Sequence, residues 1–189
     1  GTCDAGTCTF TACTGMECGE DSCGVSGGTC EAGQACQAGI CTILTWTDPT
    51  SGLTWQVSPT GGGMNWSAAK THCSELSLDG GGWHLPAIGE LRTLVRGCSA
   101  TATGGSCNVT EGDCLLWSCR NNQCSGCSAN YGPGKDGMYL PDEMLGPCCT
   151  YWSSSPIADL NGYAWYVYFD YCNVNGYNVG AGIHVRCVR

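Results

Sequence analysis

The sequence predicts an α+β fold in which a small antiparallel sheet and two short helices are joined by long, disulfide-stapled loops. Two observations predict this fold class. Helical patterns occur early in the second part of the chain, and strand-like patterns lie at both of its ends. In addition, 19 of the 189 residues are cysteine, a content typical of disulfide scaffolds. We expect two domains: a cysteine-rich N-terminal segment at 1–42 with little regular structure, and a larger domain at 43–189.

Cysteine content and net charge also bear on location and partners. Because disulfides persist in oxidising compartments, we expect a secreted protein, extracellular or on the cell surface, whose leader has been removed. The longest purely apolar runs are only a few residues, so we expect no membrane insertion. A net charge of −9 argues against nucleic acid and anionic membranes as partners, since both repel an acidic chain.

The N-terminal segment lacks the apolar residues that a core requires. Residues 1–42 contain one phenylalanine, five acids and no lysine or arginine, so cross-links must supply their order. The segment has eight cysteines: Cys3, Cys8, Cys13, Cys18, Cys23, Cys30, Cys36 and Cys41. Four disulfides are favoured over a zinc cluster, because the spacing lacks alternating close ligand pairs. The spacing does not fix which cysteines pair.

The larger domain opens with a predicted hairpin and a helix. Ile43 to Trp46 and 53–57 have strand character, and the turn residues 48–52 lie between them. Asn65 is a favourable N-cap for the helix that follows. One face of that helix carries Trp66, Ala69, Cys73 and Leu76.

A second helix is predicted after the glycine run at 80–82. Pro86 has the φ value that a first helical turn needs, and Glu90 would complement the helix dipole. Gly97 is placed to end the helix in a left-handed C-cap. The apolar face consists of Ile88, Leu91, Val95 and Cys98.

An irregular, cysteine-rich stretch at 98–150 separates this helix from the terminal strands. A structureless stretch of this length is typically functional or held by cross-links. It has eight cysteines: Cys98, Cys107, Cys114, Cys119, Cys124, Cys127, Cys148 and Cys149. Strands are predicted at 151–155, 164–169 and 183–189, and turn residues dominate 173–182.

Five blocks of the larger domain resemble the bacterial Lcl C-terminal family, of the C-type-lectin-like and formylglycine-generating-enzyme-like superfamily. The resemblance covers roughly 45–189, with the blocks in the family's order. The blocks are Thr50–Gln56, Trp66–Ala69 with Cys73, Trp83–Pro86 with Glu90 and Leu91, Tyr151–Ser154 with Ala164–Val167, and Val185–Arg189. The N-terminal segment is similar to cysteine-rich repeats of myxobacteria-like secreted proteins, at 18–23 and 32–36.

The resemblance implies a C-type-lectin-like domain whose termini meet in one small sheet, and a long variable loop region that often carries binding in relatives. It also implies a disulfide between Cys73 and Cys187, because the first helix packs beside the last strand in this fold. The triplets with which C-type lectins hold calcium do not occur; the nearest acids are Asp142 and Glu143. We therefore expect no cofactor, with calcium as the alternative.

Catalytic signatures are weak. Cys124 and Cys127 form a CxxC motif, for which structural pairing is favoured over redox activity because no basic neighbour or helix start accompanies it. Formylglycine-generating relatives use a pair of cysteines, for which Cys172 and Cys187 are the candidates, but the family's surrounding motif is absent. We expect no enzymatic activity.

One cysteine of the larger domain is expected to lack a partner. If the eight N-terminal cysteines pair among themselves, eleven remain, so one is free or forms an intermolecular bridge. Cys172 is the first candidate, and Cys148 and Cys149 follow it.

We therefore hypothesise a non-enzymatic extracellular binding or assembly module, such as a subunit of a surface filament or adhesive structure. Its partners would be further copies of itself, or an extracellular protein or glycan. The alternatives are a secreted calcium- or carbohydrate-binding lectin and a formylglycine-type thiol oxidase.

Overall fold

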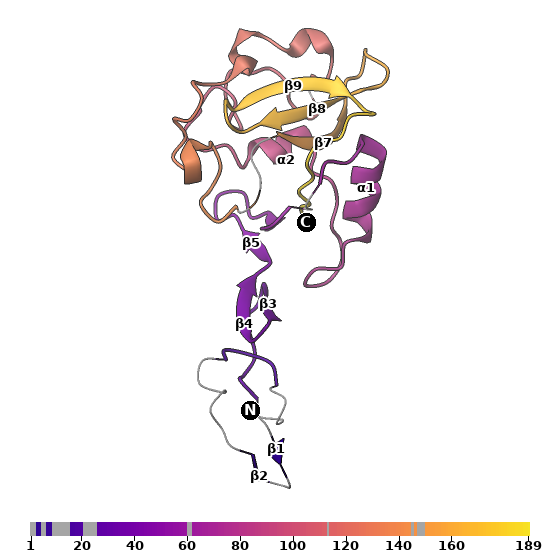
Figure 1. The fold of residues 1–189 in the computed structure, drawn as a ribbon. Coiled ribbons are helices and arrows are strands. Elements are labelled where there is room, and N and C mark those ends of the chain that lie inside the picture. Colours follow the sequence, from indigo (N-terminus) through magenta and orange to yellow (C-terminus); the bar gives the residue numbers. More distant parts are fainter. Residues whose placement is uncertain are drawn as a thin grey trace. The chain divides into compact units, whose positions relative to one another are not determined.

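A computed structural model describes residues 3–4, 7–8, 16–20, 26–59, 62–112, 114–144, 146 and 150–189 (Figure 1). Of these, 3–4 and 7–8 are described by their backbone alone. The chain divides into two compact units, Gly1–Trp46 and Thr47–Arg189. The α+β class that the sequence predicts is confirmed, since two α-helices and small antiparallel sheets occur together with several disulfides.

The described part of the first unit contains two short antiparallel hairpins. One pairs β1 (Cys3–Asp4) with β2 (Thr7–Cys8), and the other pairs β3 (Gln34–Gln37) with β4 (Ile40–Ile43). Ala38 and Gly39 connect β3 to β4 with φ values of 51° and 85°. Two successive positive φ values are what a tight two-residue hairpin turn requires.

The second hairpin moves the predicted boundary between the domains. Ile43, predicted to open the larger domain, is the last residue of β4. The next strand, β5, instead covers Thr45–Thr47. The sequence pattern missed this because Ile40 and Ile43 are apolar yet exposed, so they resemble the start of a core strand.

Disulfides hold the first unit together. Cys18 pairs with Cys36, and Cys30 pairs with Cys41. Among the described side chains of 1–46, Cys18 is the only buried hydrophobic one. This unit therefore depends on cross-links rather than on a hydrophobic core, as its composition predicts.

The second unit brings its two ends together. β6 (Thr54–Gln56) pairs with β5 and also bonds the end of the chain. The amide of Thr54 donates to Arg189 O at 2.9 Å, and that of Gln56 donates to Cys187 O at 3.0 Å. The predicted final strand at 183–189 forms isolated bridges of this kind rather than a continuous ladder.

A three-stranded antiparallel sheet forms the centre of the second unit (Figure 1). Its strands are β7 (Thr150–Pro156), β8 (Tyr163–Tyr168) and β9 (Asn173–Asn178). β9 was predicted as a turn, because asparagine and glycine dominate it. Gly176 leaves room for a neighbouring side chain, since a Cβ there would lie 2.2 Å from Ile157 Cδ1 and would force that methyl group to move. Close packing against a neighbouring side chain thus explains a residue that suggests a turn.

Two helices pack against this sheet. α1 (Trp66–Glu75) contacts β7, and the side chain of Asn65 caps it by accepting from the amide of Ala68 at 2.9 Å. α2 (Ile88–Arg92) contacts β7 and β8.

α2 is shorter than the predicted helix, for which Gly97 is the expected C-cap. After Arg92 the bonds become i to i−3, from Leu94 to Leu91 O and from Val95 to Arg92 O. Such bonds mark a tightened final turn. Gly97 has a φ of 78°, so the predicted left-handed residue follows the tightened turn instead of an α-helix.

The described part of the long irregular region contains three short 3₁₀ helices and three disulfides. The helices are Trp117–Cys119, Asn122–Ser125 and Lys135–Gly137. The disulfides join Cys98 to Cys127, Cys107 to Cys124 and Cys114 to Cys119. Across the described part of the chain, no helix combines the length and apolarity needed to cross a bilayer.

A disulfide anchors the core between α1 and the end of the chain. Cys73 of α1 pairs with Cys187, the pairing that the resemblance implies. Both sulfurs are buried among hydrophobic side chains. This core cluster also contains Ala69, Trp83, Leu85, Trp152, Ala164, Ile183 and Val185.

Candidate functional site

The central sheet has two unlike faces, set by the alternation of side chains along β8. Trp165 and Val167 point to one face and are fully buried. Ala164, Tyr166 and Tyr168 point to the other, since side chains two residues apart in a strand share a face. On this second face Ala164 belongs to the core beside α1, whereas Tyr166 and Tyr168 are only half-buried.

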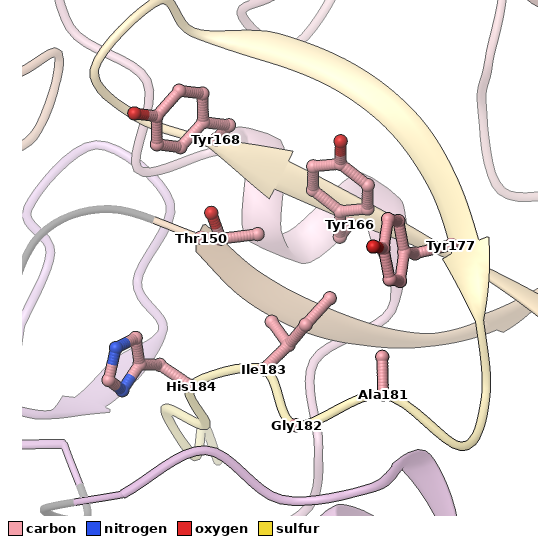
Figure 2. A pocket seen from close by; sticks show the side chains of 8 residues that line it. All are labelled: Thr150, Tyr166, Tyr168, Tyr177, Ala181, Gly182, Ile183 and His184. Atoms are coloured by element: carbon pink, nitrogen blue, oxygen red, sulfur yellow. The ribbon is translucent and has the colours of Figure 1, made fainter.

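A groove of about 600 Å³ lies over the uncovered part of this face (Figure 2). Its walls come from all three strands and from the segment that leads to the C-terminus. The lining residues are Thr150, Tyr166, Tyr168, Tyr177, Ala181, Gly182, Ile183 and His184. The volume is in the range of small-molecule and peptide sites, about 300–1,000 Å³.

Cross-strand pairing explains why these side chains converge. Thr150 of β7 lies opposite Tyr168 of β8, and Tyr177 of β9 lies opposite Ala164. Because directly opposed residues in an antiparallel pair share a face, residues distant in the sequence line one surface.

The tyrosine rings form a corner rather than a flat surface. The rings of Tyr166 and Tyr177 lie 6.3 Å apart and nearly perpendicular, at 76°. Tyr168 packs against Tyr171 at 5.4 Å, with an angle of 37°. Figure 2 shows Tyr166 and Tyr177 next to each other, with Tyr168 farther along β8 and His184 at the opposite end from Tyr177. The groove thus has an aromatic wall with an internal angle.

Burial raises the pKa of two phenols of the groove, those of Tyr166 and Tyr168. It is the main cause that raises the pKa of Tyr166, and the nearby Arg120 charge only partly offsets it. Burial also raises the pKa of Tyr168, and the charge of Asp170 acts in the same direction. Both hydroxyls therefore keep their hydrogens at neutral pH and can act as donors.

The hydroxyls of the groove differ in whether they are still free to form a hydrogen bond with a ligand. Tyr168 donates to Asp170 Oδ2 at 3.3 Å, so its hydrogen is already used. Tyr166 is bonded by the side chain of Asn175, whose carbonyl oxygen already accepts from the amide of Gly176. The Asn175 amide group is therefore the donor, and the hydrogen of Tyr166 remains available. Within the described residues, the hydroxyls of Thr150 and Tyr177 have no hydrogen-bond partner.

The groove is uncharged. None of its lining residues is an acid, a lysine or an arginine, although the whole chain carries −9. Its floor is apolar, formed by Ile183 and Ala181. Such a surface suits a neutral ligand with apolar faces and hydrogen-bonding groups.

Cys172, the first candidate for an unpaired cysteine, is a free thiol in the structure. Its exposed fraction is 0%, which excludes an intermolecular bridge unless the surrounding structure opens. Burial raises the pKa of this thiol to about 11, despite the nearby Thr101 hydroxyl and Arg92 guanidinium. The other two candidates, Cys148 and Cys149, lie outside the described residues.

The candidate thiols for redox chemistry are in disulfides or buried. Cys124 and Cys127 of the CxxC motif bond to Cys107 and Cys98, not to each other. Cys187 is bonded to Cys73, so it does not form a thiol pair with Cys172.

Neither His84 nor the acids nearest to a calcium motif join a close group of potential metal ligands among the described residues. His84 pairs with Glu90 at 3.0 Å on the surface. Asp142 and Glu143 are both exposed. Where side chains are described, the one close group of potential ligands is Cys18, Cys30 and Cys41. These sulfurs belong to the Cys18–Cys36 and Cys30–Cys41 disulfides, which do not offer thiolates.

Sequence reasoning missed the groove. The sequence pattern predicts a strand for Tyr166 and Tyr168 and a turn for Tyr177, and it assigns none of them a role in binding. The available signal is the alternation along β8, in which Tyr166 and Tyr168 share one face and Trp165 and Val167 lie on the other. A strand that is buried on one face and aromatic on the other indicates a partly open sheet.

Two comparisons with known proteins bear on identity. A comparison with curated proteins finds no match to this chain. Against models of protein families, the Lcl C-terminal domain matches residues 44–189. This match covers the groove, both α-helices, the central sheet and the Cys73–Cys187 disulfide, and it spans well over half of the chain. The chain therefore belongs to the Lcl C-terminal domain family.

Proposed function

We propose that this protein is a non-enzymatic extracellular binding module whose ligand site is the tyrosine groove of residues 47–189. The observation that supports the proposal most strongly is the groove itself. An uncharged hollow of about 600 Å³ brings three tyrosines together on a sheet face that α1 leaves open. Half-exposed aromatic side chains with free hydroxyls are typical of binding surfaces.

The disulfides support the extracellular part of the proposal. Six disulfides occur among the described residues. Such density is typical of oxidising compartments and keeps a binding surface rigid outside the cell. Rigidity favours binding because less conformational entropy is lost when the ligand docks.

The proposal that the protein is non-enzymatic rests on the properties of the side chains that could take part in catalysis. Redox chemistry needs an accessible thiolate, but the free thiol of Cys172 is buried and its pKa is raised to about 11. The groove itself contains one histidine and no carboxylate. It therefore lacks a carboxylate among its lining residues that could orient the histidine as a base.

A ligand screen with a matched variant tests the binding proposal. Glycan and peptide arrays are probed with the wild type and with a Tyr166→Ala/Tyr177→Ala double variant. We expect at least one ligand class to bind the wild type and lose its signal with the variant. If every ligand binds both proteins equally, or none binds, the groove is not the functional site.

Self-assembly is the second candidate function, and the first unit favours it. Two large apolar residues of the β3–β4 hairpin are exposed: the exposed fraction is 57% for Ile40 and 51% for Ile43. A second copy could cover this hairpin. A head-to-tail contact of this kind yields an open filament unless it closes into a ring, which would suit a surface filament or adhesive structure.

Light scattering of three proteins tests assembly. The full chain should form larger species at high concentration, and removal of 1–42 should abolish them. An Ile40→Ser/Ile43→Ser variant should weaken association without removing the disulfides. If the full chain is monomeric at high concentration, the assembly proposal fails, and the binding proposal is unaffected.

A further inference from the structure

We propose that the tyrosine groove binds a proline-rich segment of a partner protein in the polyproline II conformation. This inference rests on the proposed function, because it names the ligand class of that same site. It follows from three properties of the groove: the donors that it offers, the angle between its rings and its lack of charge.

The free hydrogen-bonding groups of the groove are three hydroxyls, which can donate, and the imidazole of His184, whose Nδ1 has no partner among the described residues. Tyr166 keeps its hydrogen because the side chain of Asn175 donates to the phenol oxygen. The hydroxyls of Thr150 and Tyr177 have no partner among the described residues. A polyproline II segment offers the complement, because its backbone carbonyls are not bonded internally and proline has no amide hydrogen.

The angle between the two tyrosine rings favours a ligand that carries a compact apolar ring over a ligand that carries a flat ring. Tyr166 and Tyr177 meet at 76° with centroids 6.3 Å apart, so they form two walls of a corner. Ile183 and Ala181 add an apolar floor beneath it. A proline ring can contact both walls and the floor at once, as in other aromatic-lined grooves that bind polyproline II segments.

The length of the aromatic wall matches an extended ligand. Tyr166 and Tyr168 share one face of β8 and therefore stand roughly 7 Å apart along the strand. One turn of polyproline II advances about 9 Å. Successive turns of the ligand can thus contact the Tyr166–Tyr177 corner and then Tyr168.

The lining argues against two other ligand classes. Anionic ligands need lysine or arginine, and none lines the groove. Sugars carry several hydroxyls on each ring, and each hydroxyl that is buried needs partners. The groove contains no carboxylate, amide or guanidinium side chain, and the Tyr168 hydrogen is already used by Asp170. Its polar groups suit a few carbonyls rather than many hydroxyls.

Calorimetric titration of the full chain with acetyl-decaproline-amide tests this inference. The comparison ligands are a glycine–serine peptide of equal length and cellohexaose, a neutral oligosaccharide. We expect saturable binding of decaproline with a Kd below about 1 mM. We expect weaker or no binding of the flexible peptide, because it loses more conformational entropy.

Variants show whether the binding occurs in the groove. Tyr177→Ala removes one wall of the corner and should weaken decaproline binding about 10-fold or more. Tyr166→Phe keeps the ring and removes the hydroxyl, and should weaken binding by about 3-fold to 10-fold. The control is Tyr131→Ala, a residue that is 81% exposed and does not line the groove. It should leave the affinity unchanged.

Three results would overturn the inference: no saturable binding of decaproline, equal affinity for the glycine–serine peptide, or binding that Tyr177→Ala leaves intact. If cellohexaose binds in a way that depends on Tyr177 and decaproline does not bind, the ligand is a neutral sugar rather than a proline-rich segment. The proposed binding function is then retained. If no array ligand depends on the groove either, the proposed function fails as well.

Discussion

Arg96 Nη2 lies 2.9 Å from Asp48 Oδ1, and this contact ties the turn between β5 and β6 to the residues that follow α2. The carboxylate of Asp48 is fully buried. It also accepts from the amide of Thr50 at 3.0 Å and from the hydroxyl of Ser51 at 2.8 Å. Burial alone would raise the pKa of Asp48, but these hydrogen bonds and the Arg96 charge together hold it below 3.8.

Asp48→Ala should destabilise the protein by about 2–3 kcal/mol at pH 7, because it leaves Arg96 and two turn donors without their acceptor. The folded-state pKa of Asp48 is lowered, so its contribution is present above 3.8 and is lost as the pH falls through the folded-state value. Urea unfolding at pH 7 and at about pH 3 should therefore show a smaller difference between wild type and variant at the lower pH.

The matched control is Asp79→Ala, which removes a partly exposed ion pair with Arg189. Its cost should be below about 1 kcal/mol. If Asp48→Ala and Asp79→Ala lower the free energy of unfolding equally, the hydrogen bonds around the buried Asp48 do not contribute more to stability than a surface ion pair.

Removal of the Cys73–Cys187 disulfide should cost more than any other single cross-link among the described residues. The two cysteines are separated by 114 positions, the longest span of the six described bridges. Loop-closure entropy gives about 4–5 kcal/mol for a loop of this length, as an upper value. Chemical unfolding of a Cys73→Ala/Cys187→Ala variant measures the loss. Cys114→Ala/Cys119→Ala, which opens a span of 5 positions, should lose clearly less.

Trp83→Ala should destabilise the protein by about 3–5 kcal/mol, as large-to-small changes in a core do. The ring is buried in the cluster around the Cys73–Cys187 disulfide, and its indole donates to Leu78 O at 2.8 Å. Thermal and urea unfolding measure the change. Trp117→Ala, at a ring that is partly exposed, should cost less. A loss under about 1 kcal/mol for Trp83→Ala would mean that the cluster does not depend on this ring.

Cys172 should resist alkylation in the native protein and react once the protein is unfolded. The thiol is buried, and its pKa is raised from 9.0 to about 11. Because the folded-state pKa is the higher one, the thiol's contribution to stability is intact below 9.0 and is lost as the pH rises toward 11. Mass spectrometry after N-ethylmaleimide treatment, with and without denaturant, checks the reactivity. Rapid native labelling would show that the thiol is accessible.

The sequence predicts elements whose cause is local. The α1 helix follows from one apolar face and from Asn65, which caps it as expected. The β5–β6 turn follows from the turn residues at 48–52. The Cys73–Cys187 bridge was implied by the family resemblance, since pairing cannot be read from spacing.

The sequence pattern does not predict elements whose structure depends on residues far away in the chain. β9 looks like a turn until the packing of Ile157 explains Gly176. α2 ends early although its apolar period continues to Cys98, because the chain tightens after Arg92. The groove is not predicted either, because its residues are far apart in the sequence. Thr150, Tyr166 and Tyr177 become neighbours only through cross-strand register, which the sequence does not specify.

Methyl NMR of the full chain tests most directly whether the groove is the ligand site. Ile183 lies in the groove floor, whereas Ile88 is buried in α2, outside the groove. The chain is titrated with each ligand that binds in the arrays, beginning with decaproline. The account predicts that the Ile183 δ1-methyl resonance shifts in a saturable way while that of Ile88 stays in place. A ligand that binds the domain and leaves the Ile183 resonance unchanged would contradict it.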